Sequence, residues 1–80
     1  MKRMYCCNSR LTTVVSDDPR KIVDHVRKRY ETEGFSLSDV SKVGQWLENN
    51  REEVLWLSFM KRDGDSFSLA WTTVHPCESL

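Results

Sequence analysis

The chain contains few glycines, prolines and cysteines, the residues that form flexible linkers and disulfide bridges. Its 80 residues include only three glycines, two prolines and three cysteines. No Pro/Gly-rich linker, low-complexity run or internal repeat interrupts it, and it is shorter than the commonest domains of about 100–150 residues. We therefore expect residues 1–80 to form one small domain, with residues 75–80 as a flexible tail.

Long apolar runs are missing as well. No stretch approaches the roughly 18–20 apolar residues that span a bilayer, and the opening MKRMYCCNSR lacks the apolar core of a secretory signal. Cys6, Cys7 and Cys77 form an odd set with one adjacent pair, unlike the spaced, even sets of secreted disulfide domains. We expect a cytoplasmic protein with free thiols and no membrane contact.

Surplus charge is absent too. Twelve Lys+Arg balance twelve Asp+Glu, which argues against a globally basic nucleic-acid binder and against an acidic DNA mimic. The balance hides an asymmetry, because residues 1–30 hold eight basic and three acidic side chains (+5) and residues 31–80 hold four and nine (−5). This predicts either a polarised surface or salt bridges between the two parts.

The first half of the chain predicts a strand followed by a helix. Residues 11–15 are rich in β-branched side chains, and one main strand is favoured there over a hairpin that turns at residues 8–9. Asp18 and Pro19 are a typical N-cap and first helical residue. Gly34 suits the position past the helix end, so a helix is expected from Pro19 to about Glu33.

A second helix is predicted from about residue 39 to residue 48. Ser36 or Ser38 can cap its start, and Asn49 and Asn50 suit its end. Its apolar stripe contains Val40, Val43, Trp46 and Leu47, with Gly44 inside the helix.

Residues 54–74 predict a β-hairpin. Asp63 and Gly64 are a favoured two-residue loop of the type I′ class, which would place Trp56 opposite Trp71 and Met60 opposite Phe67. The side chains assigned to the core on one face of this hairpin are Val54, Trp56, Met60, Phe67, Leu69 and Trp71.

The expected fold class is α+β. The predicted element order is β-α-α-β-β in a small two-layer domain. Its C-terminal hairpin turns at Asp63 and Gly64. Both helices are expected on one sheet face, the one that carries Trp56 and Trp71. The other face of the first hairpin strand carries Leu55, Leu57 and Phe59. A strand that is apolar on both faces is either central in its sheet or part of an interface. If the first hairpin strand is central, we expect residues 11–15 to pair beside it.

Few side chains in the sequence could bind a metal or catalyse a reaction. Cys6, Cys7, His75 and Cys77 match no common zinc-ligand spacing, and a Cys–His nucleophile has no supporting motif. His25, Arg27, Arg29 and Tyr30 lie on different sides of the first helix, so they do not converge as the groups of a ribonuclease would. We expect no enzyme activity, no catalytic residue, no metal and no cofactor.

The sequence therefore predicts a small non-enzymatic regulator, inhibitor or adaptor, of the kind that phages and mobile elements encode. Its partner would be another protein or a second copy of the chain, bound at Leu55, Leu57 and Phe59. A basic helix face would steer an acidic partner, and nucleic-acid binding through that face is the alternative function. The basic face consists of Arg20, Lys21, Arg27, Lys28 and Arg29.

Overall fold

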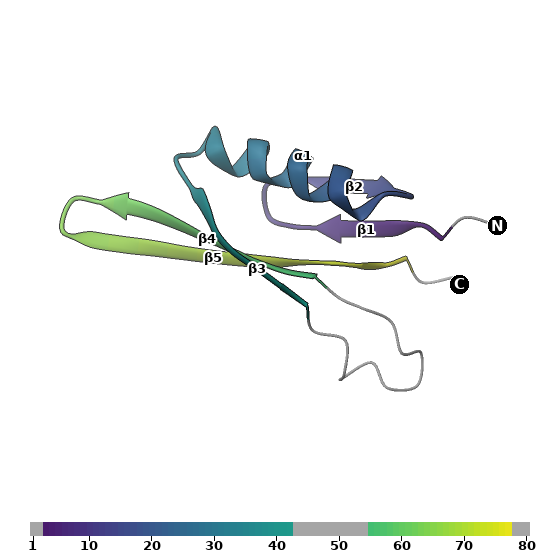
Figure 1. The fold of residues 1–80 in the computed structure, drawn as a ribbon. Coiled ribbons are helices and arrows are strands. Elements are labelled where there is room, and N and C mark those ends of the chain that lie inside the picture. The colour runs from purple at the N-terminus through teal and green to yellow at the C-terminus, as the bar shows by residue number, and fades with distance from the viewer. Residues whose placement is uncertain (1–2, 43–54, 78–80) are drawn as a thin grey trace.

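The described residues form a five-stranded antiparallel sheet with one helix on one face (Figure 1). A computed structural model describes residues 3–42 and 55–77. The strands are β1 (Tyr5–Asn8), β2 (Thr13–Ser16), β3 (Ser36–Lys42), β4 (Leu55–Asp63) and β5 (Ser66–Pro76), and the helix is α1 (Pro19–Glu31). The strands lie in the order β2-β1-β5-β4-β3, every neighbouring pair antiparallel. The predicted order β-α-α-β-β is therefore wrong for the described part of the chain.

The helix α1 begins where its capping residues predict. Asp18 has an extended backbone, and its Oδ1 accepts a hydrogen bond from the backbone N–H of Arg20 at 3.0 Å. Pro19 takes the first helical position, where its missing N–H is not needed. Gly34 follows the helix with φ +92°, a conformation that strains any residue with a Cβ. The start is confirmed, and the helix ends two residues earlier than expected.

The second helix was predicted where the structure has the strand β3. Leu37 lies opposite Phe59 and Val40 lies opposite Leu57, with a register shift between Leu37 and Asp39. This bulge at Ser38 inserts one residue, so Leu37 and Val40 face the same side although three positions separate them. A spacing of three between apolar residues is also typical of a helix, and for that reason the sequence pattern predicted a helix here. The rest of the predicted helix, residues 43–48, lies outside the described residues.

The N-terminal segment forms a hairpin rather than one strand. β1 pairs with β2 from Tyr5↔Ser16 to Asn8↔Thr13, and the turn is closed by the bond from the Ser9 N–H to the Thr12 carbonyl at 2.9 Å. β1 then pairs with the end of β5. β2 is an edge strand, so the prediction that residues 11–15 flank β4 is wrong.

The C-terminal hairpin is confirmed with a shifted register. Asp63 lies opposite Ser66, so the loop is formed by residues 64–65 rather than 63–64. Met60 consequently lies opposite Leu69 instead of Phe67. The register differs by two residues, which keeps every side chain on the predicted face. β5 continues through His75 and Pro76, two residues that were expected to belong to a tail.

The core lies between α1 and one face of the sheet. Ile22, Val26 and Tyr30 form the buried stripe of α1. The Tyr30 ring stacks on Phe59, with centroids 4.2 Å apart, and meets the edge of Phe35 at 5.7 Å. The sheet contributes Cys7, Leu57, Phe59 and Val74 to the same cluster. The helix therefore covers the face of Leu57, and the prediction that the core lies on the face of Trp56 and Trp71 is wrong.

Candidate functional site

Leu55, Leu57 and Phe59, the predicted partner-binding residues, lie on the face that α1 covers. Leu57 is 0% exposed and Phe59 is 1% exposed. Leu55 is half-buried and packs against the same cluster. The structure thus brings the three together, but as part of the core, where Leu57 and Phe59 are out of reach of a partner.

Four of the seven large exposed apolar side chains in the described residues lie on the opposite face of the β4–β5 hairpin. Together with Trp56 they form a set that we call the open face: Trp56, Met60, Phe67, Leu69 and Trp71. Trp56 is half-buried, whereas Met60, Phe67, Leu69 and Trp71 are 39%, 59%, 74% and 62% exposed. One helix about 10 Å wide cannot cover both faces of a sheet, and none of the described residues forms a second layer over this one.

Ring contacts order the open face. Trp56 and Trp71 stack with centroids 4.4 Å apart and planes inclined by 12°. They are diagonal neighbours, because Trp71 lies opposite Ser58 and Trp56 lies opposite Thr73, and long side chains reach across such a diagonal. The Arg62 guanidinium lies 5.9 Å from the centroid of Phe67, within cation–π range. The three aromatic side chains of the open face, Trp56, Phe67 and Trp71, therefore each have a ring contact on that face.

Polar residues border the open face. Ser36, Asp39 and Ser41 of β3 lie opposite Met60, Ser58 and Trp56. At the other end, the Cys6 Sγ lies 3.3 Å from the Nε2 of His75, and these two residues are opposite each other on β1 and β5. An apolar centre with a polar rim is the usual arrangement of a protein–protein interface.

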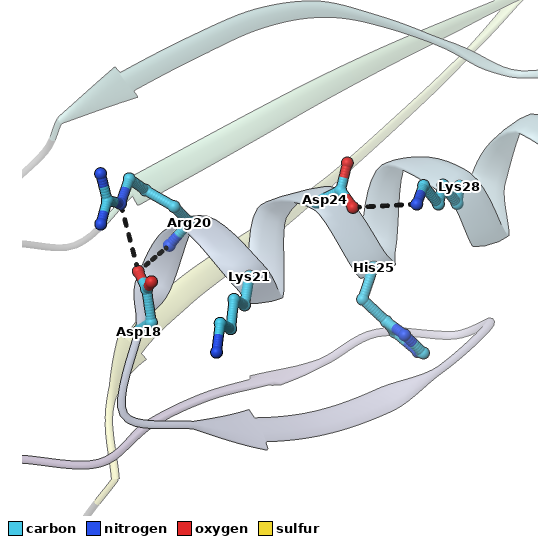
Figure 2. Close-up of a pocket in the computed structure, with 6 residues that line it drawn as sticks. All are labelled: Asp18, Arg20, Lys21, Asp24, His25 and Lys28. Atoms are coloured by element: carbon cyan, nitrogen blue, oxygen red, sulfur yellow. Dashed lines mark hydrogen bonds and ion pairs between the residues drawn. The ribbon is translucent and has the colours of Figure 1, made fainter.

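The basic face lies on α1, on the other side of the sheet from the open face (Figure 1). A shallow hollow beside its first two turns is drawn in Figure 2, lined by Asp18, Arg20, Lys21, Asp24, His25 and Lys28. The hollow brings together three of the five residues predicted for this face, Arg20, Lys21 and Lys28. Two carboxylates lie among them.

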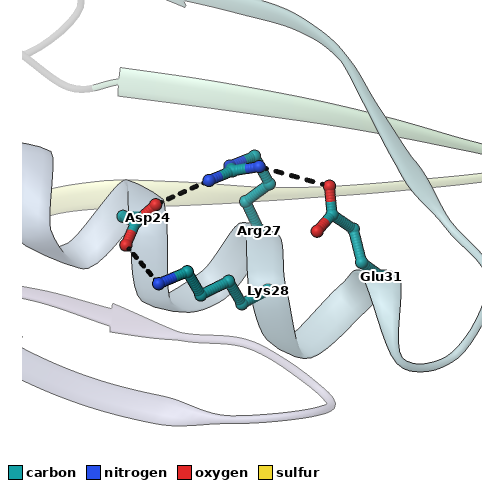
Figure 3. Close-up of polar contacts among 4 residues, drawn as sticks. All are labelled: Asp24, Arg27, Lys28 and Glu31. Atoms are coloured by element: carbon teal, nitrogen blue, oxygen red, sulfur yellow. Dashed lines mark hydrogen bonds and ion pairs between the residues drawn. The ribbon is translucent and has the colours of Figure 1, made fainter.

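Ion pairs within the helix offset much of this positive charge. Asp24 binds Arg27 at 2.6 Å and Lys28 at 3.1 Å, and Glu31 binds Arg27 at 3.3 Å (Figure 3). The hydrogen bond from Arg27 lowers the pKa of Asp24, and the reciprocal bond raises the pKa of Arg27. The backbone N–H of Arg20 likewise lowers the pKa of Asp18. These bridges all join neighbouring turns of α1, and Glu31 is the one partner among them that belongs to the acidic part, residues 31–80.

The cysteines do not form a metal site in the described residues. Cys7 is buried, which raises the pKa of its thiol, although a hydrogen bond with the Thr72 hydroxyl opposes the rise. Cys6 contacts His75, and the Cys77 N–H donates to the Met4 carbonyl at 2.9 Å. Residues 4–6 therefore lie beside residues 75–77. Within residues 3–42 and 55–77, however, no three His, Cys, Asp or Glu residues are placed to hold a metal ion.

Comparisons with known proteins add no family assignment. No protein-family model, no curated protein and no solved structure gives a significant match to the chain. In the part of the chain that the structure describes, no helix combines the length and the apolar character needed to cross a bilayer.

Sequence reasoning grouped the open-face residues correctly and then assigned them to the core. No signal in the sequence selects the buried face, because β4 is apolar on both of its faces. The selection comes from α1, whose buried residues at positions 22, 26 and 30 pack with Cys7, Leu57, Phe59 and Val74.

Proposed function

We propose that the chain is a non-enzymatic binding module that docks another protein against its open face, as a regulator, inhibitor or adaptor. The observation that carries this proposal is the exposure of Met60, Phe67, Leu69 and Trp71 side by side on one sheet face. Monomeric soluble proteins rarely expose contiguous apolar patches of this kind unless the patch binds something. Three free thiols fit a reducing compartment such as the cytoplasm.

The chemistry of the open face suits a protein partner. Tryptophan is among the residues that contribute most to interface energies, and an aromatic side chain offers about 150–250 Å² of contact area. A standard interface needs about 800 Å² on each side. The aromatic and aliphatic side chains of the open face supply a large part of that area, and the serines of β3 and β4 can satisfy hydrogen bonds at its border.

The basic face would act at a distance from this contact. It points away from the open face because α1 covers the opposite side of the sheet. Its cations therefore steer an acidic partner during approach and raise the association rate at low salt, without direct contact at the docked surface.

Nucleic-acid binding through the basic face is the alternative. Phosphates would have to displace Asp24 and Glu31 from Arg27 and Lys28, since those carboxylates already pair with the two cations. This competition favours the protein-docking proposal. The nucleic-acid alternative predicts binding that falls steeply with salt.

Affinity capture from the native host with matched baits tests the proposal. The baits are the unchanged chain, W71A, which shortens an open-face side chain, and S68A, a change of the same strand on its other face. We expect at least one protein that the unchanged chain and S68A capture and that W71A loses, since truncating a hot-spot residue weakens binding by about 2 kcal/mol or more.

Two outcomes would contradict docking at the open face. A partner retained by W71A would show that docking uses another surface. Capture of nucleic acid alone, sensitive to salt and lost in K21E, would support the alternative. Circular dichroism of each bait must show the same fold, so that the loss of binding is a property of the surface.

A further inference from the structure

One strand edge of the sheet is open at its most apolar part. β5 pairs with β4 along residues 66–74, but the described residues of β1 pair with β5 only at Tyr5↔Pro76 and Cys6↔His75. Residues 66–71 therefore have β4 on one side and no described strand on the other. Figure 1 shows this part of the hairpin extending past α1, β1 and β2. We call the unpaired side of residues 66–71 the β5 edge.

The other described edges carry features that prevent strand pairing, and the β5 edge does not. β2 has four residues and is followed by Asp17 and Asp18. β3 contains a bulge and Asp39, and the tip of β4 beyond β3 ends in Lys61, Arg62 and Asp63. Shortness, bulges and charges are how proteins block edge-to-edge association. The β5 edge reads Ser-Phe-Ser-Leu-Ala-Trp, without a charge, a proline or a glycine.

The ladder geometry decides which backbone groups the β5 edge presents. The pair Asp63↔Ser66 adjoins a two-residue loop, so it exchanges hydrogen bonds, and the pairs alternate from there. Ser66, Ser68 and Ala70 therefore direct their N–H and C=O groups toward β4. Phe67, Leu69 and Trp71 direct theirs outward, and their side chains lie on the open face.

This edge is complementary to itself. If two copies are antiparallel about Leu69, then Leu69 lies opposite Leu69 of the second copy, and Phe67 lies opposite its Trp71. These are the three residues whose backbone groups point outward, so the register can complete a ladder of six hydrogen bonds. It also pairs apolar side chains on one face and the small Ser68 and Ala70 on the other. The zero net charge of the chain adds no overall repulsion between copies.

We propose that the occupant of the β5 edge is a second copy of this chain, joined to the first by antiparallel β5–β5 pairing centred on Leu69. The product is a symmetric dimer in which β3, β4 and β5 of the two copies form one continuous six-stranded sheet, with the β1–β2 hairpin of each copy beside the far end of its own β5. Side chains opposite each other lie on the same face of a sheet, so the two open faces form one apolar surface. This inference goes beyond the proposed function and does not depend on it, because it concerns the strand edge.

Sedimentation equilibrium on the unchanged chain and three variants tests the dimer. The unchanged chain should sediment with twice the mass of one chain at sub-millimolar concentration. L69P removes an outward N–H from each copy, and with it two bonds of the ladder, which should weaken dimerisation about 10- to 100-fold. L69E places two carboxylates opposite each other and should also give monomers. M60E places the same charge on the open face of β4, one strand away from the edge, and should remain dimeric.

The outcomes separate edge pairing from the alternatives. A dimer that M60E abolishes and L69P preserves would show that the open faces pack against each other, and it would overturn the proposal. A monomeric unchanged chain would overturn it as well, as would a dimer that survives both Leu69 variants. L69E keeps the test valid if L69P does not fold. Host-protein capture by a monomeric chain would still support the proposed function, so the two can fail separately.

Discussion

Replacing Leu57 by glutamate is expected to unfold the protein, whereas L69E leaves it folded. Both residues are leucines in the same β4–β5 hairpin, and they lie on opposite faces of it. Leu57 is 0% exposed beneath α1, whereas Leu69 is 74% exposed on the open face. A carboxylate at position 57 would be buried within an apolar cluster, at a free-energy penalty of several kcal/mol, comparable with the total stability of about 5–15 kcal/mol of a typical domain.

Circular dichroism and urea unfolding at pH 7 measure this difference. L57E should lack the cooperative transition of the unchanged chain. L69E should keep the transition within about 0.5 kcal/mol, as surface substitutions usually do, once any effect of dimer dissociation is removed by working at low concentration. The reverse pattern, a folded L57E and an unfolded L69E, would show that the sheet faces have been assigned the wrong way round.

Truncating Tyr30 to alanine is expected to remove most of the stability. Tyr30 is 2% exposed and is the largest side chain that α1 contributes to the core. Its ring holds the helix to the sheet through Phe59 and continues to Phe35 before β3. Large aromatic-to-alanine changes in cores cost about 3–5 kcal/mol, because the transfer energy is lost and a cavity remains.

The matched control for Y30A is R29A, the adjacent and exposed position on the same helix. Its effect should be within about 0.5 kcal/mol. Guanidinium unfolding curves of both variants compare the midpoints. If Y30A and R29A were equally stable, α1 would not be held to the sheet by this ring stack, and the described packing would be incorrect.

Local chemistry made part of the fold predictable. The start of α1 follows from Asp18 and Pro19, whose capping roles need no tertiary contact. The C-terminal hairpin follows from two alternating strands around a loop that contains Gly64. The predicted loop position was wrong by one residue. The prediction placed Asp63 and Gly64 in the two loop positions, as is usual for an Asp-Gly pair. In the structure Gly64, with φ +63°, is the first loop residue and Asp65 is the second.

Long-range contacts decide the features that the sequence left open. β3 resembles a helix because the bulge at Ser38 breaks its period of two, and the Ser38 hydroxyl bonds the Ser58 carbonyl at 3.0 Å on the neighbouring strand. The identity of the core face is another such feature. Alternation groups Trp56 with Met60 and Leu57 with Phe59, but β4 is apolar on both faces, so only the position of α1 selects the buried one.

The candidate site changed for the same reason. The sequence predicted a partner-binding sheet face at Leu55, Leu57 and Phe59, whereas the structure leaves the opposite face of the β4–β5 hairpin exposed. The basic face was located correctly on α1, yet three of its neighbours, Asp18, Asp24 and Glu31, neutralise part of it. The spacings of three and four residues between the partners on α1 are readable in the sequence, but the rotamers that form these pairs are not.

Hydroxyl-radical footprinting of the free chain, read by mass spectrometry at a concentration low enough to give monomers, tests whether the open face, and not the face beneath α1, is the apolar surface available to a partner. We predict rapid oxidation of Met60, Phe67, Leu69 and Trp71, together with protection of Tyr30, Leu57 and Phe59. Protected open-face side chains in the monomer, with Leu57 and Phe59 oxidised, would contradict the account.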